Sequence, residues 1–326
     1  MSHRDRAYLP PGWLIGGHAQ TIYPFLLRRR PDITYRRERI DTPDGDFIDF
    51  DWLDSTGGAS ANTPLVVLFH GLEGNSRSHY ATALMQHLQI LGWRGVVPHF
   101  RGCSGEPNRL PRAYHSGDYV EVGWMLGILR AAIRDAPLYV IGVSLGASAL
   151  LNWLGREQYA ARDIVTAATA VSAPLDLTAA GRAIGQGFNR LYAMHFLYTL
   201  KPKALAMAQR FPGLLDARAL RKIDSMYAFD EIVTAPLHGF ANADDYWVRA
   251  SSKPWLRGIA VPTLVLNALN DPFVPPASLP CSKQVSRSVV LEQPPHGGHV
   301  GFLQTPFPGR MDWLPTHLLN FLADSR

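Results

Sequence analysis

Six short, continuously apolar runs are separated by stretches of helical length, and this spacing limits the fold more than any other feature of the sequence. The runs lie at residues 65–69, 95–98, 138–143, 165–171, 263–266 and 288–291. Strands that are apolar along their whole length are buried on both faces, as in a parallel sheet covered by helices. Helices are predicted in between, at residues 78–91, 116–134, 147–159 and 313–323. The sequence therefore predicts an α/β fold with a mostly parallel central sheet and helices on both faces.

Two parts of the chain depart from this alternation. Residues 33–40 and 47–52 have the pattern of strands, and the Thr-Pro-Asp-Gly turn signal at 42–45 joins them into a predicted antiparallel hairpin. Residues 171–261 hold no convincing core strand and carry aromatic residues at mostly helical spacings, which predicts a helical insertion. These aromatic residues either pack within the insertion or form an apolar wall that binds an acyl chain.

The domain organisation follows from these segments. With 47% hydrophobic and 18% charged residues among 326, the chain can bury a large core. We expect an N-terminal arm at 1–30 packed on the core, a core at 31–175 and 256–326, and a cap or lid at 176–255.

The sequence favours a soluble, cytoplasmic protein. No apolar run reaches the length needed to cross a bilayer, and residues 1–6 lack the apolar stretch of a secretory signal. The two cysteines, Cys103 and Cys281, are too few for a disulfide framework, so reduced thiols are expected.

The net charge is +5, with a pI near 9.3. The basic residues are spread along the chain and form no single stripe, which argues against a nucleic acid partner. The densest cluster consists of Arg28, Arg29, Arg30, Arg36, Arg37 and Arg39. It is either an ordinary solvated surface or a surface that attracts anionic lipid head groups and makes transient contact with a membrane. No obligate protein partner is evident from the sequence.

The pentapeptide Gly-Val-Ser-Leu-Gly at 142–146 stands where an apolar strand meets a helix rich in Ala and Leu at 147–155. A serine projected from a sharp strand-to-helix turn needs small neighbours two residues away on each side, and Gly142 and Gly146 meet that need. On its own the pattern also fits a serine in an ordinary glycine-bounded turn. In this context it predicts that Ser144 is a nucleophile.

A serine hydroxyl needs an imidazole as base and a third group that orients the imidazole. Asp271, beyond the carboxyl end of the predicted strand 263–266, is the preferred acid, and Asp176 is the second candidate. The sequence Pro-His-Gly-Gly-His after the last strand offers two histidines. We prefer His299 to His296 as the base, because the two glycines before His299 allow a tight turn and the apolar residues after it can anchor the loop.

Acyl transfer also needs hydrogen-bond donors for the oxyanion of the tetrahedral intermediate. The backbone N–H groups of Leu72 and Leu145 are the predicted donors, with Gly71 supporting the loop that follows the first parallel strand. His70 and Glu73 in that loop could instead bind a metal. No His or Asp cluster completes such a site, so neither a metal nor a cofactor is expected.

Four further polar residues have two interpretations each. Cys103 and Ser104 could act as nucleophiles, but neither has the elbow arrangement, which favours packing and loop hydrogen bonding. His18 and Gln20 lie in a Pro- and Gly-rich segment at 8–24, which we expect to lie over the main domain without a long regular helix. They are explained equally well as site residues or as structural hydrogen-bonding residues.

Several motifs occur together in this chain: G-H-A-Q-T at 17–21, H-G-L-E-G at 70–74, F-R-G-C-S-G at 100–105, G-V-S-L-G at 142–146, T-A-P-L-H-G-F at 234–240, A-D-D-Y at 243–246, N-D-P-F at 270–273 and H-G-G-H-V-G-F at 296–302. Together they resemble the YheT-like branch of the α/β-hydrolases, which is related to the eukaryotic ABHD esterases and phospholipases. The resemblance covers essentially the whole chain from residue 8. It implies the α/β-hydrolase fold and places Ser144, Asp271 and His299 at the catalytic triad positions. It also implies cleavage of carboxylic esters, with short acyl esters or acylglycerol-type lipids as substrates.

We therefore expect a serine esterase in which Ser144 forms an acyl-enzyme. Two alternatives remain open: an acyltransferase that uses the same triad, and a non-catalytic binding module on a hydrolase fold. A dehalogenase of this fold is disfavoured, because the elbow carries Ser and not Asp.

Overall fold

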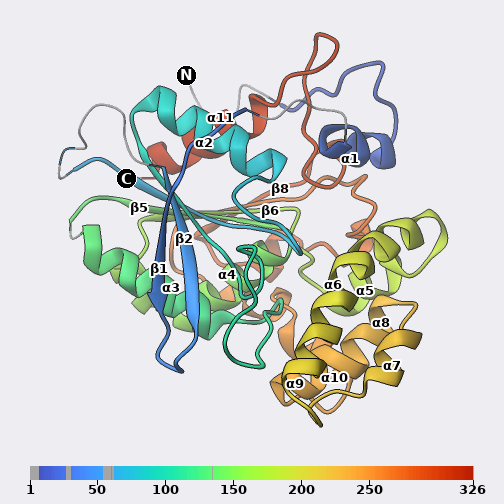
Figure 1. Cartoon of the computed structure of the whole chain (residues 1–326). Helices are drawn as coiled ribbons and strands as arrows, with labels where there is room; N and C mark the ends of the chain where they lie inside the picture. Colours follow the sequence, from blue (N-terminus) through green and yellow to red (C-terminus); the bar gives the residue numbers. More distant parts are fainter. Residues whose placement is uncertain (1–6, 27–30, 54–59, 61, 134, 326) are drawn as a thin grey trace.

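The computed structural model of the chain describes residues 7–26, 31–53, 60, 62–133 and 135–325. Eight strands form one sheet in the order β1-β2-β4-β3-β5-β6-β7-β8 (Figure 1). Their bounds are β1(Arg36–Asp41), β2(Phe47–Leu53), β3(Leu65–Phe69), β4(Arg94–Pro98), β5(Leu138–Val143), β6(Ala167–Val171), β7(Thr263–Leu266) and β8(Val289–Glu292). The pairs β1·β2 and β2·β4 are antiparallel, and the other neighbouring strands are parallel. The predicted α/β class, the hairpin and the mostly parallel sheet are confirmed.

The α-helices are α1(Gly17–Leu26), α2(His79–Leu91), α3(Tyr119–Ile133), α4(Leu145–Glu157), α5(Leu177–Ile184), α6(Arg190–Arg210), α7(Ala217–Lys222), α8(Met226–Phe229), α9(Ala235–His238), α10(Ala243–Ala250) and α11(Trp313–Asp324). Short 3₁₀ and π turns lie between them: η2(Gln158–Asp163), η3(Gly187–Asn189), η4(Asp230–Thr234), η5(Lys253–Gly258), η6(Pro276–Ser278) and η7(Ser282–Gln284). In the described part of the chain, no helix combines the length and the apolar character needed to span a bilayer.

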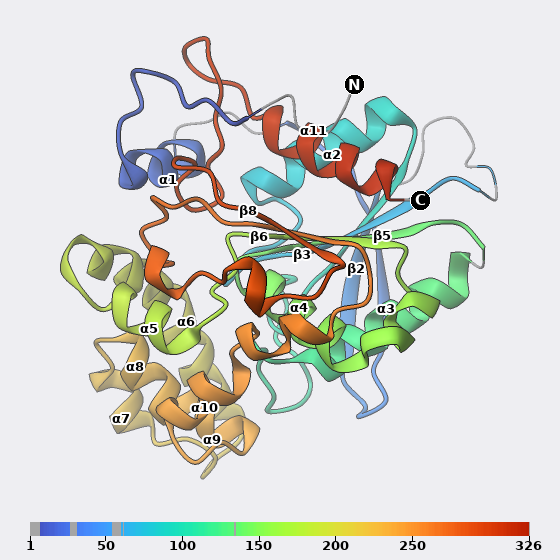
Figure 2. The same ribbon diagram turned by 180° about the vertical axis from the view of Figure 1, so that it is seen from behind.

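Helices cover both faces of the sheet, with α2 and α11 on one face and α3 and α4 on the other (Figures 1 and 2). Successive side chains of a strand point to opposite faces. Thus Val66 of β3 packs in the same core cluster as Leu88 of α2, whereas its neighbour Val67 packs in the cluster that holds Leu126 of α3 and Leu150 of α4. This double burial explains why the strands are apolar along their whole length.

The segment between β6 and β7 is helical and contains α5 to α10, which lie together at one side of the sheet (Figure 1). We call it the insertion. It has a small core of its own, which includes Leu197, Leu220 and Phe229. The role of the insertion as a cap or lid stays a prediction.

The N-terminal segment is more regular than its Pro and Gly content suggested. It forms the ten-residue helix α1, with Pro24 inside it. Short isolated helices are marginal in water, and tertiary packing stabilises most of those found in proteins. Here Gln20, Thr21 and Pro24 are buried against the core, which offsets the poor local propensity.

The predicted basic cluster divides into two parts. Residues 28–30 lie outside the described residues. Arg37 and Arg39 stand on β1, and their guanidinium groups form ion pairs with the buried carboxylates of Asp51, at 2.7 Å, and Asp49, at 2.8 Å. These two arginines therefore already have anionic partners within the chain.

Candidate active site

Ser144 stands between β5 and α4 with φ of 54° and ψ of −118°. A positive φ is rare for a residue that has a Cβ and marks a strained turn. A Cβ added to Gly142 would lie 2.6 Å from Cα of Ala147, and one added to Gly146 would lie 2.5 Å from the carbonyl oxygen of His70. Only glycine fits at either position, which explains the predicted elbow pattern in steric terms.

His299 connects Ser144 to Asp271. Its Nε2 lies 2.9 Å from Oγ of Ser144, and its Nδ1 lies 2.8 Å from Oδ2 of Asp271. An ionised carboxylate can only accept hydrogen bonds, so this geometry assigns the imidazole proton to Nδ1 and leaves Nε2 to accept from the serine hydroxyl. The other oxygen of Asp271 accepts a hydrogen bond from the N–H of Phe273 at 2.8 Å, which fixes the orientation of the carboxylate. The ring of Phe273 packs against that of His299, with centroids 4.3 Å apart.

The two second-choice residues lie elsewhere. His296 is exposed, and Asp176 caps α5 by accepting a hydrogen bond from the N–H of Ala179 at 3.0 Å. Within the described residues, neither forms a hydrogen bond to Ser144 or His299. The structure thus brings together the three preferred residues and leaves out the two alternatives.

The loop after β3 lies against the elbow, since a Cβ added to Gly71 would stand 3.1 Å from Cβ of Ser144. Leu145 occupies the first position of α4, where a backbone N–H has no partner within the helix. The N–H of Leu72 donates to no other group of the described chain. Both N–H groups are thus available for an oxygen atom bound next to Ser144, where the positive end of the α4 dipole also lies.

Three side chains hold this loop. The hydroxyls of Tyr80 and Tyr114 accept hydrogen bonds from the N–H groups of Gly71, at 2.9 Å, and Glu73, at 2.7 Å. His70 is fully buried, and its burial lowers the pKa of the imidazole to about 3, so the ring is neutral at pH 7. Its Nε2 accepts a hydrogen bond at 3.1 Å from the backbone of the loop after β4. Among the described residues no group of His, Cys, Asp and Glu side chains is arranged to hold a metal ion, and His70 is accounted for as a structural residue.

The arm contacts both loops that carry the predicted acid and base. Oε1 of the buried Gln20 accepts hydrogen bonds from Nδ2 of Asn270 and from the N–H of Gly297, each at 2.9 Å. Oγ1 of Thr21 accepts a hydrogen bond from the N–H of His299 at 2.8 Å. Gln20 and Thr21 therefore link the loop of Asp271 to the loop of His299, and among the described residues neither forms a hydrogen bond with Ser144.

His18 points to the insertion instead. Its Nδ1 lies 3.1 Å from the hydroxyl of Tyr192 in α6, and the two rings are stacked. Tyr192 in turn contacts the ring of Phe273, with centroids 4.6 Å apart. His18 is thus separated from His299 by two aromatic rings, which favours the structural interpretation of this histidine.

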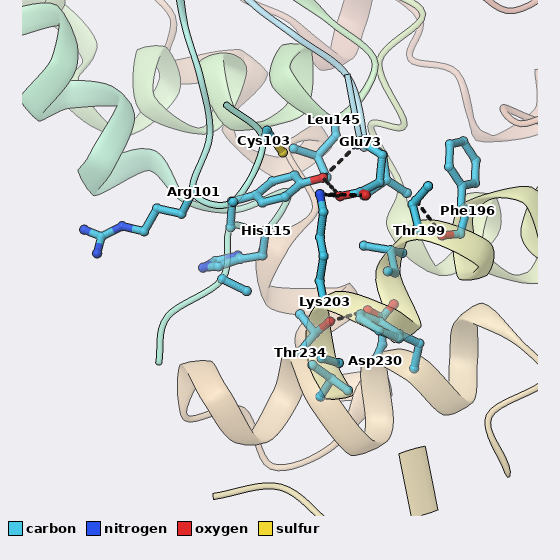
Figure 3. A pocket seen from close by; sticks show the side chains of 18 of the residues that line it. Glu73, Arg101, Cys103, His115, Leu145, Phe196, Thr199, Lys203, Asp230 and Thr234 are labelled. Carbon is cyan, nitrogen blue, oxygen red and sulfur yellow. Dashed lines mark hydrogen bonds and ion pairs between the residues drawn. The ribbon is translucent and has the colours of Figure 1, made fainter. Parts of the chain in front are cut away.

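A cavity of about 740 Å³ opens beside Ser144. The core contributes Leu72 and Leu145 to its wall, and α6 contributes Phe196, Leu200 and Met207. Figure 3 shows Leu145 at one end of this cavity and Asp230 with Thr234 at the other. The wall between the two ends is predominantly apolar.

Three carboxyl groups line the cavity, those of Glu73, Glu106 and Asp230, and the first and the last of these have different kinds of partner. Glu73 forms an ion pair with Lys203 of α6 at 2.8 Å, which joins the insertion to the loop beside Ser144 (Figure 3). Among the described residues, the donors to Asp230 are both neutral: Oγ1 of Thr234 at 2.7 Å and Nε1 of Trp247 at 2.8 Å. Burial raises the pKa of Asp230 to about 6.

The two rival nucleophiles, Cys103 and Ser104, differ from Ser144 in their surroundings. Cys103 lies in the cavity wall, and burial raises the pKa of its thiol to about 12, so the reactive thiolate is scarce at neutral pH. The backbone oxygen of Ser104 accepts a hydrogen bond from Arg37 at 2.7 Å, as expected for a structural loop. Within the described residues, no hydrogen bond joins the Ser104 hydroxyl to a histidine.

Sequence reasoning missed several residues that support the site. Thr21, Asn270 and Phe273 fall inside the quoted motifs, which could have singled them out. Tyr114 and Lys203 fall in no motif, and only the folded chain brings them to Glu73.

Comparisons with known proteins identify the fold family. A family model described as "alpha/beta hydrolase fold" matches residues 64–306. The chain is 38% identical over 319 residues to the protein YheT of Escherichia coli (strain K12), covering 97% of this chain and 93% of that protein. It is 30% identical over 321 residues to the human phospholipase ABHD3, covering 97% of this chain and 78% of that protein. Among solved structures, a Pyrococcus furiosus esterase matches with a TM-score of 0.56 and 16% identity, covering 90% of this chain and 91% of that chain, which shows a shared fold.

Proposed function

The chain belongs to the α/β hydrolase fold family, and from that premise we propose that it is a serine hydrolase that cleaves carboxylic esters through an acyl-enzyme on Ser144. Ester hydrolysis is the general activity that the relatives support. One observation carries the mechanism: at a strained elbow, His299 is hydrogen-bonded to Ser144 at 2.9 Å and to Asp271 at 2.8 Å.

In the proposed reaction, His299 Nε2 takes the hydroxyl proton as Ser144 Oγ attacks the ester carbonyl. Asp271 holds the ring through Nδ1 and stabilises the imidazolium that forms. The N–H groups of Leu72 and Leu145 donate to the oxyanion, and each such donor contributes on the order of 3 kcal/mol to transition-state stabilisation. His299 then protonates the leaving alcohol, and a water molecule activated by the same imidazole releases the acid.

We further propose that the cavity beside Ser144 holds the acyl chain of a hydrophobic ester, with short-chain esters or acylglycerol-like lipids as substrates. The apolar side chains of Phe196, Leu200 and Met207 support this placement, since apolar surface buried on binding favours a hydrophobic ligand. The phospholipase name of the human relative agrees with a lipid ester.

The test of the mechanism is turnover of p-nitrophenyl esters by purified Ser144→Ala, with Ser104→Ala as the matched control. We expect Ser144→Ala to lose roughly 10⁴-fold or more in kcat/KM and Ser104→Ala to keep the wild-type rate. Near-normal turnover by Ser144→Ala would exclude the proposed nucleophile.

The test of the acyl site is a series of esters of increasing acyl length, measured with the wild type and with Met207→Trp. If the cavity holds the acyl chain, kcat/KM rises beyond acetyl in the wild type, and the bulkier Trp moves the optimum to shorter chains. A maximum at acetyl that Met207→Trp leaves unchanged would contradict this placement.

A further inference from the structure

Exposed apolar side chains lie on three adjoining parts of the chain: the arm, η3 with the first half of α6, and the loop before α11. Ring contacts join these parts: Trp13 with Phe307, centroids 5.4 Å apart, and Phe25 with His195, centroids 5.6 Å apart. A further contact joins the arm to η3, just before α6, since the ring centroid of His18 lies 4.6 Å from that of Phe188. We call this surface the apolar face. Its exposed members are Trp13, Ile15, Phe25, Leu26, Phe188, Leu191, Met194, Tyr198 and Phe307.

Helix α6 has two apolar sides. Phe196, Leu200 and Met207 face the cavity, as described above. Leu191, Met194 and Tyr198 follow one another at helical spacing on a second side and are 55%, 62% and 81% exposed. A surface helix normally turns its second side to water with polar residues, so this exposed apolar stripe requires an explanation.

The segment that carries the exposed stripe of α6 has basic residues and no acidic ones. Residues 177–215, which contain α6, hold no Asp or Glu and five basic residues, Arg182, Arg190, Lys201, Lys203 and Arg210. Lys203 and Arg210 line the cavity, whereas Arg182 and Arg190 are exposed. Residues 7–26 of the arm also lack acidic residues. Arg190, the first residue of α6, is exposed beside the stripe. In the loop before α11, Arg310 lies 3.7 Å from Asp312, and their opposite charges offset each other. That loop therefore contributes mainly the apolar Phe307 to the face.

We propose that the apolar face docks on the surface of an anionic lipid layer, with its aromatic and aliphatic side chains inserted at the boundary of head groups and acyl chains. An exposed apolar stripe on a segment that carries basic and no acidic side chains matches the composition of an interfacial lipid-binding surface. The same helix lines the cavity, so docking would hold the cavity next to lipid. This proposal concerns binding and does not depend on the catalytic role of Ser144.

The test is flotation of the full chain carrying Ser144→Ala with two kinds of vesicle, phosphatidylcholine alone and phosphatidylcholine mixed with phosphatidylglycerol. We expect binding to the mixed vesicles, weakened by high salt, because salt screens the attraction between Arg190 and the anionic head groups. In the same background, Leu191→Asp with Met194→Asp weakens binding about tenfold or more, and Arg190→Glu weakens it about tenfold for mixed vesicles.

The matched control is Val120→Asp, because Val120 is 66% exposed on α3, a helix that contributes nothing to the apolar face. This variant should bind vesicles as the parent does. In protein that retains Ser144, Leu191→Asp should hydrolyse a water-soluble ester at the wild-type rate, since Leu191 lies outside the cavity wall.

Three results would overturn the proposal. The first is the absence of binding to mixed vesicles, and the second is equal loss of binding in Leu191→Asp and Val120→Asp. The third is a dimer in sedimentation velocity that Leu191→Asp dissociates, because a second copy of the chain would then be the occupant of this face.

Discussion

The two halves of the candidate site are positioned in different ways. Ser144 and the N–H of Leu145 are fixed by one continuous segment, β5 followed by α4, in which two glycines permit a strained turn. His299 and Asp271 stand on separate loops, and both loops donate hydrogen bonds to the distant arm, which links them. A local motif can therefore encode the position of the proposed nucleophile, whereas the positions of the proposed acid and base depend on the complete fold.

The largest expected effect is removal of the base. His299→Ala should lower kcat/KM by roughly 10⁴-fold or more, because Ser144 loses its proton acceptor. His296→Ala is the matched control from the same loop and should stay close to wild type, since His296 is exposed. A large loss in His296→Ala with activity retained in His299→Ala would reverse the assignment.

Replacement of the acid should have the next largest effect. Asp271→Asn keeps the shape of the side chain but no longer favours the proton on Nδ1 of His299, so we expect kcat to fall roughly 10³- to 10⁴-fold. Asp176→Asn should keep its activity, because Asp176 serves as a helix cap and Asn also caps helices well. Steady-state kinetics of both variants on one soluble ester measures the difference.

The arm allows a sharper test of the comparison between the two halves. Thr21→Val leaves the N–H of His299 without its acceptor, and we expect kcat to fall about 10- to 100-fold with little change in KM. Thr82→Val is the control, since that hydroxyl donates to the carbonyl oxygens of Ser78 and His79 at the start of α2. Equal kcat values in both variants would show that the arm does not position the base.

In the half of the site that holds Ser144, we expect substitutions of the turn glycines to act mainly on the stability of the protein. Gly142→Ala places a Cβ 2.6 Å from Cα of Ala147, and we expect a loss of about 1–3 kcal/mol in the free energy of unfolding. Gly127→Ala in α3 has open space around the new Cβ and should be neutral or stabilising. Denaturant melts of the two variants give the comparison, and equal midpoints would contradict the steric explanation of the elbow.

The smallest effect is expected at the rival nucleophile. Because burial raises the pKa of Cys103 to about 12, its thiol stays protonated and should resist iodoacetamide at neutral pH, whereas the exposed Cys281 should react. Ester turnover should survive the modification of Cys281. Rapid modification of Cys103 with parallel loss of activity would point to a thiol mechanism.

The predictions from sequence also divide into features that a local pattern encodes and features that depend on the complete fold. The runs at 65–69, 138–143 and 263–266 coincide with β3, β5 and β7, because burial on both faces leaves a clear apolar signal. The sequence predicts a helical insertion but not the bounds of its separate helices, because their apolar residues face a small local core, the cavity or solvent.

In the site, Ser144 could be read from a contiguous pattern, and the positions of Asp271 and His299 followed from strand ends in chain order. The hydrogen bond between the N–H of His299 and Oγ1 of Thr21 joins residues 278 positions apart, and no local pattern predicts it. The same limit applies to Lys203, which meets Glu73 from 130 residues away. Such partners are set by the packing of the arm and the insertion on the core, which propensity and periodicity do not encode.

The most direct measurement of the central claim is peptide mapping by mass spectrometry after reaction with an active-site fluorophosphonate. The proposed mechanism predicts one phosphonate on the peptide that contains Ser144 and labelling that His299→Ala slows strongly. Labelling at Ser104 or Cys103, or an unlabelled protein that still turns over esters, would contradict it.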